Sequence, residues 1–196
     1  MRRWMSLSLI VVFIATIAVA QDDATQKAKA EKKECCGEKC AVQIKDIEAF
    51  DYAAVEMTGS FEQHGQAFMT LYQEAGAQGL PMDSAPTGIY YNNPEMVAET
   101  DLKWEVALSV PDASKVKEPL KGKTWKHTKI ASVVYEGPFD ENYRAQYNKI
   151  MSCISEKGLV PAGPSMEKHL TMAAQDENGV WVGKVEICLP VMKKTE

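Results

Sequence analysis

The chain has 196 residues, 45% of them hydrophobic, and a formal net charge of −5 at pH 7. Once a short N-terminal segment is set aside, this length suits one domain with a proper hydrophobic core. The charge argues against a nucleic acid as partner, because a phosphate backbone is bound by clustered lysines and arginines, and the basic runs here are interrupted.

The first 20 residues have the composition of a secretory signal peptide. Arg2 and Arg3 begin it, residues 7–19 form an apolar stretch, and Ala18 and Ala20 supply the small residues of a cleavage site. We therefore predict cleavage after Ala20 and a secreted or periplasmic protein that has no membrane segment after cleavage. An uncleaved membrane anchor is the alternative, because the apolar stretch is long enough for either.

Residues 21–41 are predicted to form a flexible tether that carries a cysteine cluster. Up to residue 34 the composition is polar and lacks aromatic residues, so this part cannot bury enough apolar surface to become ordered. Cys35, Cys36 and Cys40 follow, and in an exported protein such thiols favour a disulfide, with one of the five cysteines left over. A copper or zinc thiolate site at these three cysteines is the alternative.

A first repeat unit, residues 42–112, reads as strand, helix, strand, strand. Residues 42–58 are extended chain, and Ser60 with Gln63 forms a capping box that begins a helix. Apolar side chains then recur at helical spacing until two glycines end the helix. Two further strands are predicted, over residues 85–91 and 102–110.

A second unit, residues 124–192, repeats this order. Residues 126–135 are extended, a Gly-Pro turn follows, and Asp140 is the expected N-cap of a helix that Gly158 ends. The remaining strands are predicted over residues 165–172 and 180–191, with a hairpin turn at residues 176–179.

The two units agree in register. Gly59 matches Gly137 at an offset of 137 − 59 = 78, and residues 103–106 match residues 184–187 at 184 − 103 = 81. We therefore predict an α+β fold in which duplicated β-α-β-β units form a pseudo-twofold antiparallel sheet, with two helices on one side and a central ligand groove. Two unrelated α+β domains are the alternative that this register disfavours.

Residues 42–192 resemble the GyrI-like small-molecule-binding domain, the effector-binding domain of bacterial transcription activators. The resemblance rests on the strand and Gly-x-Phe entry to the helix in both halves, and on residues 88–94, 163–169 and 186–191. It assigns residues 42–196 to one such domain, whose duplicated architecture the SOUL haem-binding proteins share. It also implies a groove for apolar, often cationic, organic molecules.

The same resemblance places a glutamate at the centre of the groove, and by motif this is Glu167. His169 stands where the family usually has another aromatic residue. Strand alternation independently puts Glu167 and His169 on one face of their strand. A carboxylate in a partly dry groove favours a cation or a proton, whereas the alternative for Glu167 is a solvated strand residue.

Further candidates surround this position. In the last strand Glu186 and Cys188 alternate with apolar residues that should pack under the helices. We therefore expect Glu186, with its counterpart Glu105, to face the other way, towards the groove. The aromatic residues predicted as walls of the pocket are Tyr135, Tyr91, Trp104 and Trp181, with ordinary core packing as the alternative for each.

No cofactor is predicted. His64, His127 and His169 are scattered without the spacing of a zinc site, although His64 or His169 as a haem ligand is an alternative. Cys153 and Cys188 are expected to be buried small hydrophobic residues and not a reactive pair.

Three functional hypotheses follow. The first is an exported binding protein, without catalytic activity, for a small apolar or cationic molecule anchored by Glu167. The second is a hydrolase of small electrophilic molecules, in which Glu167 is the acid or base beside Tyr135. The third is a thiol- or metal-handling protein that acts through Cys35, Cys36 and Cys40.

Overall fold

The computed structural model describes residues 41–195 of the chain. The predicted signal peptide, nearly all of the tether and the cysteines at positions 35, 36 and 40 lie outside the described residues. None of the helices within residues 41–195 has the length and apolarity that a membrane span requires.

The described residues form ten strands and two α-helices, together with three short 3-10 turns. In chain order they are β1 (Gln43–Asp46), β2 (Phe50–Thr58), η1 (Phe61–Gln63), α1 (His64–Ala77), β3 (Thr87–Tyr90), η2 (Glu99–Asp101), β4 (Lys103–Ser109), η3 (Ala113–Lys115), β5 (Lys121–Trp125), β6 (Lys129–Pro138), α2 (Glu141–Glu156), β7 (Leu159–Pro161), β8 (Ser165–His169), β9 (Ala174–Gln175) and β10 (Trp181–Lys193).

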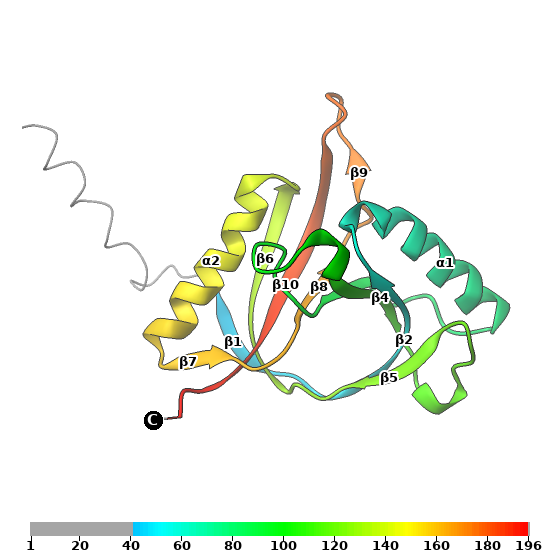
Figure 1. The fold of residues 1–196 in the computed structure, drawn as a ribbon, viewed down its shortest axis with the longest axis horizontal. Coiled ribbons are helices and arrows are strands. Elements are labelled where there is room, and N and C mark those ends of the chain that lie inside the picture. Colours follow the sequence, from blue (N-terminus) through cyan, green and yellow to red (C-terminus); the bar gives the residue numbers. More distant parts are fainter. Residues whose placement is uncertain (1–40, 196) are drawn as a thin grey trace, which may run out of the picture. The chain divides into compact units, whose positions relative to one another are not determined.

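One antiparallel sheet runs through both repeat units, as predicted. Its order is β1-β6-β10-β8-β3-β4-β2-β5, with β7 and β9 paired to β10. The order β6-β10-β8 of the second unit mirrors β2-β4-β3 of the first, and the units join where β3 pairs with β8. Figure 1 shows α1 and α2 flanking the strands at this centre. The fold is therefore the pseudo-twofold α+β architecture that the duplication indicated.

The outer strands are exchanged between the two units. β1 begins the first unit but pairs with β6 of the second, and β5 begins the second unit but pairs with β2 of the first. Our prediction treated residues 42–58 as one extended run and missed β5, whose sequence KGKTW is rich in lysine and glycine, which strands disfavour. Through this exchange, β1 and β5 cover the two outer edges of the six central strands.

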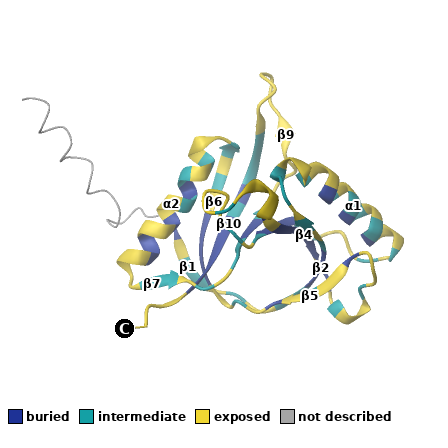
Figure 2. Ribbon diagram, viewed as in Figure 1, coloured by how far each residue is buried: buried dark blue, intermediate teal, exposed yellow. Residues whose placement is uncertain are grey.

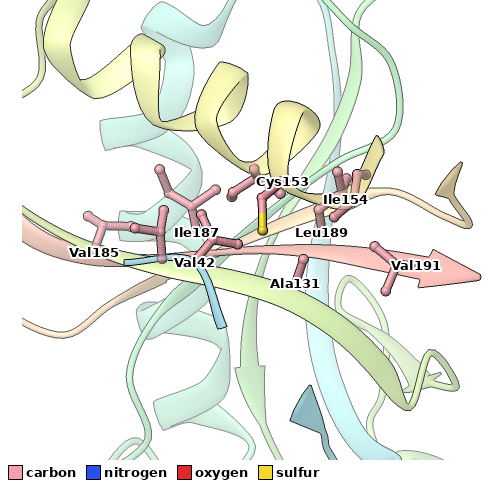
Figure 3. Close-up of a cluster of buried hydrophobic side chains, with 10 residues drawn as sticks. Val42, Ala131, Cys153, Ile154, Val185, Ile187, Leu189 and Val191 are labelled. Carbon is pink, nitrogen blue, oxygen red and sulfur yellow. The ribbon is translucent and has the colours of Figure 1, made fainter. Parts of the chain in front are cut away.

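Both helices pack on the same face of the sheet, each over its own unit. α1 covers β2 and β4, and α2 covers β6 and β10. Figure 3 shows Cys153 and Ile154 of α2 against Val185, Ile187 and Leu189 of β10, as the alternation in β10 predicted. Dark-blue buried residues in Figure 2 line the inner sides of both helices and the central strands.

The opposite face of the sheet has its own apolar cluster. It includes Tyr52, Ile89, Met166 and Cys188, all at most 5% exposed. Cys188 therefore lies on the other face from Cys153, and burial raises the pKa of its thiol to about 12. Both cysteines are buried, as predicted.

The helix starts differ in detail between the units. Asp140 caps α2 as predicted, accepting from the backbone N–H groups of Asn142 at 2.8 Å and Tyr143 at 3.3 Å. Ser60 instead caps the turn η1 through the N–H of Glu62 at 3.3 Å, and α1 begins only at His64. This later start leaves the imidazole of His64 in the first turn of α1, beside the centre of the sheet.

Candidate functional site

A single row of side chains crosses the helix-covered face of the sheet through its centre. In order, the paired residues are Val55, Val106, Gly88, Glu167, Ile187 and Val133. Val106 and Ile187 are counterparts in the repeat (187 − 106 = 81), so their partners Gly88 and Glu167 are counterparts too. The pseudo-twofold axis thus passes between a glycine of one unit and a glutamate of the other.

The carboxylate of Glu167 is enclosed by hydroxyl groups. Glu167 is only 7% exposed. Its Oε2 accepts a hydrogen bond from Tyr90 Oη at 3.0 Å, and its Oε1 accepts one from the Tyr147 hydroxyl. The Tyr90 hydroxyl also lies 3.0 Å from Nε2 of His64. Side chains of β3, β8, α1 and α2 therefore meet in one hydrogen-bonded chain.

Gly88 makes the contact between Tyr90 and Glu167 possible. A Cβ atom at Gly88 would lie 2.5 Å from Tyr90 Oη and 2.9 Å from Cζ, closer than non-bonded atoms can approach. The tyrosine ring folds back over the bare glycine backbone towards the neighbouring strand. The glycine opposite Glu167 is therefore part of the site, because it leaves the space that the ring fills.

Aromatic side chains surround this chain of hydrogen bonds. The ring of His64 lies 4.3 Å from that of Trp104, and His169 lies 5.6 Å from Phe68 of α1 and 6.4 Å from Phe139 beside α2. We call the surrounding rings the aromatic shell, and its members are Phe61, Phe68, Trp104, Phe139, Tyr143 and His169.

Burial sets the protonation of the groups around Glu167. It raises the pKa of the Tyr90 and Tyr147 hydroxyls well above the ordinary value of 10, and the carboxylate of Glu167 raises both further. Both tyrosines are therefore hydrogen-bond donors at neutral pH. Burial also lowers the pKa of His64 and His169, which favours neutral imidazoles.

His169 has one polar atom without a partner. Its Nε2 is buried and makes no hydrogen bond, the one such side-chain atom within residues 41–195. Strand alternation put His169 on the face of Glu167, and the register of β8 against β10 confirms this placement. A nitrogen left unsatisfied between Phe68 and Phe139 is an open position for a polar group.

Three carboxylates on the central strands have different partners. Glu105 is fully buried and lies 2.6 Å from Lys123 Nζ, and Glu186 lies 2.5 Å from Lys45 Nζ. Among the described residues no ion pair involves Glu167, whose partners are hydroxyl groups alone. Glu167 is therefore the buried carboxylate that lacks a cationic partner in this part of the chain.

The prediction that Glu186 faces the central groove is wrong. Its neighbour Ile187 pairs with Glu167 and lies under α2, so Glu186 points to the opposite face of the sheet. Its counterpart Glu105 lies on that face as well. The matching lysines Lys45 and Lys123 are also counterparts, since 123 − 45 = 78. The duplication thus repeats an ion pair on the face away from Glu167.

Tyr91 was also predicted to face the groove, and this is wrong. Its hydroxyl donates to Glu105 Oε1 at 2.8 Å on the opposite face, and 47% of the residue is exposed. The prediction had matched Tyr91 with His169, but Tyr90 pairs with Trp104 while His169 pairs with Val185, so Tyr90 is the true counterpart. A one-residue shift in the comparison of the units exchanges the two faces of the strand.

Tyr135 and Trp104 lie on the expected face but do not touch Glu167. The Tyr135 hydroxyl donates to the Pro138 carbonyl at 2.9 Å, and its ring lies 5.7 Å from that of Tyr143. Trp104 is 1% exposed, and its indole N–H donates to the Gly59 carbonyl at 3.0 Å. Tyr135 is thus at the rim of the aromatic shell.

Two tyrosines and a histidine supply contacts that the sequence analysis did not assign. Tyr90 was passed over in favour of Tyr91, and Tyr147 was given no role in the site. His64 was considered only as a metal or haem ligand. For Tyr147 and His64 the sequence did offer a signal, because each places a polar group within an otherwise apolar face of its helix. A polar group that is buried in this way needs a hydrogen-bond partner.

Hollows in the surface lie away from this site. One of about 710 Å³ is lined by residues after α1 and around η3, including Gly79, Pro111 and Lys117, and another of about 260 Å³ lies by Gly137 and Thr171. Neither is lined by Glu167. The predicted groove is closed over the carboxylate by the tyrosines and the aromatic shell. Within residues 41–195 no cluster of three or more His, Cys, Asp or Glu side chains could hold a metal ion.

The Lys45–Glu186 pair predicts a specific loss of stability in acid. Burial opposes the effect, but hydrogen bonds from Lys45 and Ser132 outweigh it and lower the pKa of Glu186 below its ordinary 4.5. The stabilisation that the ion pair gives the folded protein is complete above pH 4.5. It is lost as the pH falls through the lowered pKa of Glu186.

Lys45→Met should therefore reduce the free energy of unfolding by about 1 kcal/mol at neutral pH, and the difference from wild type should shrink in acid. Urea unfolding at both pH values measures it. Lys126→Met, which removes an exposed lysine, is the matched control. A Lys45→Met effect that is unchanged in acid would show that the ion pair is not its cause.

Comparisons with known proteins agree with this fold. The model of the GyrI-like small molecule binding domain matches residues 41–192. A hydrolase from Listeria innocua has a similar structure, with a TM-score of 0.60 at 13% identity over 77% of this chain and 91% of that chain. EcmrR in a DNA complex gives 0.64 at 18% identity over 78% and 57%. Among curated proteins, no sequence matches the chain.

Proposed function

Because this chain belongs to the GyrI-like small molecule binding domain family, we propose that it binds an organic cation beside Glu167, between α1 and α2. The observation that carries this proposal is a carboxylate, 7% exposed, that has hydroxyl partners but no ion pair among the described residues. A buried carboxylate without a counter-ion is costly, so a cationic ligand would supply what the chain does not.

The surroundings of Glu167 favour a cation with apolar, aromatic groups. Phe61 packs against Tyr90, a hydrogen-bond partner of the carboxylate, and the rings of Phe68 and Phe139 pack against His169 on the same strand as Glu167. A cation over such rings gains about 0.5 to 2 kcal/mol for each good contact. The hydroxyls of Tyr90 and Tyr147 would turn away from Glu167 as the ligand enters, and their rings would then contact it.

Two probes of the same shape and opposite charge test the proposal. Tetraphenylphosphonium and tetraphenylborate both offer four phenyl rings, but only the first carries positive charge. We expect quenching of tryptophan fluorescence with a much lower Kd for tetraphenylphosphonium, because Trp104 lies in the aromatic shell. Equal or inverted affinities would refute a cation site at Glu167.

We also propose that the protein acts outside the cytoplasm after removal of residues 1–20. The support is the basic start, the apolar stretch and the small residues before Gln21. Expressed as the full chain with its native N-terminus, the mature protein should have the mass of residues 21–196. An intact mass that still includes residues 1–20 would contradict this prediction.

Hydrolysis of a small electrophilic molecule is a second candidate, favoured by the hydrogen-bonded chain of His64, Tyr90 and Glu167 and by the similar fold of the Listeria hydrolase. The acid or base would be Glu167, and its tyrosine partners would be Tyr90 and Tyr147 and not Tyr135, whose hydroxyl is bound to Pro138. Turnover of epoxide or ester substrates that survives Glu167→Gln would exclude this role.

A further inference from the structure

The hydrogen atoms in the series of hydrogen bonds that runs from the Phe61 carbonyl to the Glu167 carboxylate can be counted. The Phe61 carbonyl can only accept, and Nδ1 of His64 lies 2.5 Å from it, so Nδ1 carries a hydrogen. In a neutral imidazole Nε2 is then an acceptor. Nε2 lies 3.0 Å from the Tyr90 hydroxyl, which also lies 3.0 Å from Glu167 Oε2.

One hydrogen is missing from this arrangement if His64 is neutral and Glu167 is ionised. Tyr90 has a single O–H, yet it would face two acceptors, the imidazole nitrogen and the carboxylate oxygen. Lone pairs would then oppose each other across one of the two contacts. An additional proton, on His64 or on Glu167, lets every contact have one donor and one acceptor.

We propose that His64 and Glu167 share one proton through Tyr90 in the ligand-free protein, and that an entering organic cation displaces this proton to solvent. Charge balances, because one positive charge enters as one leaves, and no bond other than O–H or N–H breaks. The inference rests on the proposed function, since it concerns the same cation at the same carboxylate. It makes His64 a positioning residue that controls the charge of the site.

The groups around the shared proton are consistent with its being held there. Glu167 is faced by Tyr90 from β3, by Tyr143 and Tyr147 from α2, by His64 from α1 and by His169 on its own strand. The tyrosines stay protonated because burial raises their pKa. Within residues 41–195 no lysine or arginine pairs with Glu167 to replace the proton.

Proton release can be measured during binding. Calorimetric titrations with tetraphenylphosphonium, in phosphate and in Tris at the same neutral pH, differ in enthalpy by the number of protons released times the difference in buffer ionisation enthalpy. We expect about one proton per cation, and an affinity that rises about tenfold per pH unit while the proton is held. Binding that depends on Glu167 but releases no proton overturns this inference and leaves the cation site intact.

Two variants separate the role of the imidazole from general effects. In His64→Gln the amide can donate to Tyr90 Oη, so Tyr90 can donate to an ionised carboxylate without an additional proton. Proton release should then fall close to zero. His127→Gln is the matched control, because His127 lies against Gly163 and Trp125 and should leave the release unchanged. Equal release in wild type and His64→Gln contradicts the proposal.

A measurement without ligand covers the case in which tetraphenylphosphonium does not bind. In the ligand-free protein at neutral pH, nitrogen-15 shifts of His64 and carbon-13 shifts of the Glu167 carboxyl report their protonation directly. We expect either an imidazolium with a carboxylate or a neutral imidazole with a carboxylic acid. A neutral imidazole beside an ionised carboxylate would overturn the inference whatever the ligand.

Discussion

Glu167→Gln should weaken the binding of tetraphenylphosphonium by about 2 kcal/mol, roughly thirtyfold in Kd. The amide keeps the size of the side chain, so the surrounding aromatic rings can still contact the cation. What is lost is the negative charge in a site that is 7% exposed, where charges are poorly screened. Fluorescence titration of both proteins measures the change.

Glu186→Gln is the matched control for this substitution. It makes the same chemical change on the neighbouring strand, but on the opposite face of the sheet beside Lys45. We expect its Kd for tetraphenylphosphonium to equal that of wild type. A similar loss in both variants would mean that general electrostatics, and not contact with Glu167, determines the affinity.

Leu71→Ala and Ile150→Ala should each lower the free energy of unfolding by about 3 kcal/mol, within the range of 2 to 5 for buried aliphatic truncations. The two residues are counterparts (150 − 71 = 79), and both are 0% exposed, Leu71 on α1 and Ile150 on α2. Because the sheet is continuous through β3 and β8, we expect one cooperative transition in each variant.

Urea unfolding followed by circular dichroism and by tryptophan fluorescence tests this expectation. Met69→Ala, on the exposed side of α1 with 63% of the residue accessible, is the control and should change the free energy of unfolding by less than about 0.5 kcal/mol. Separate transitions for the two probes would show that the repeat units unfold independently, against a single shared sheet.

The duplicated fold could be predicted from the sequence because its signals are local. A strand, a Gly-x-Phe turn and a helix ended by glycine recur at an offset of 78 or 79 residues, and Asp140 and the helix-ending glycines mark the boundaries. The exchange of β1 and β5 was not predicted. Pairing of strands distant in sequence leaves no mark in either strand alone.

The site was predicted in part. Glu167 and His169 were placed on the correct face by alternation in a single strand. Glu186 was correctly placed on the face opposite to Ile187, but the groove was expected on that face. Tyr91 was placed on the wrong face because it was compared with His169 one residue out of register, and such a shift reverses the face. His64 was not linked to Glu167, since their contact through Tyr90 depends on the late start of α1 and on the bare backbone of Gly88.

A crystal structure of the protein with tetraphenylphosphonium would show directly whether the cation binds beside Glu167. We expect the cation between α1 and α2, with its phenyl rings against the aromatic shell and the side chains of Tyr90 and Tyr147 turned away from Glu167. A cation bound instead in the hollow of about 710 Å³ beside Gly79 and Lys117, with the hydroxyls still on Glu167, would contradict this expectation.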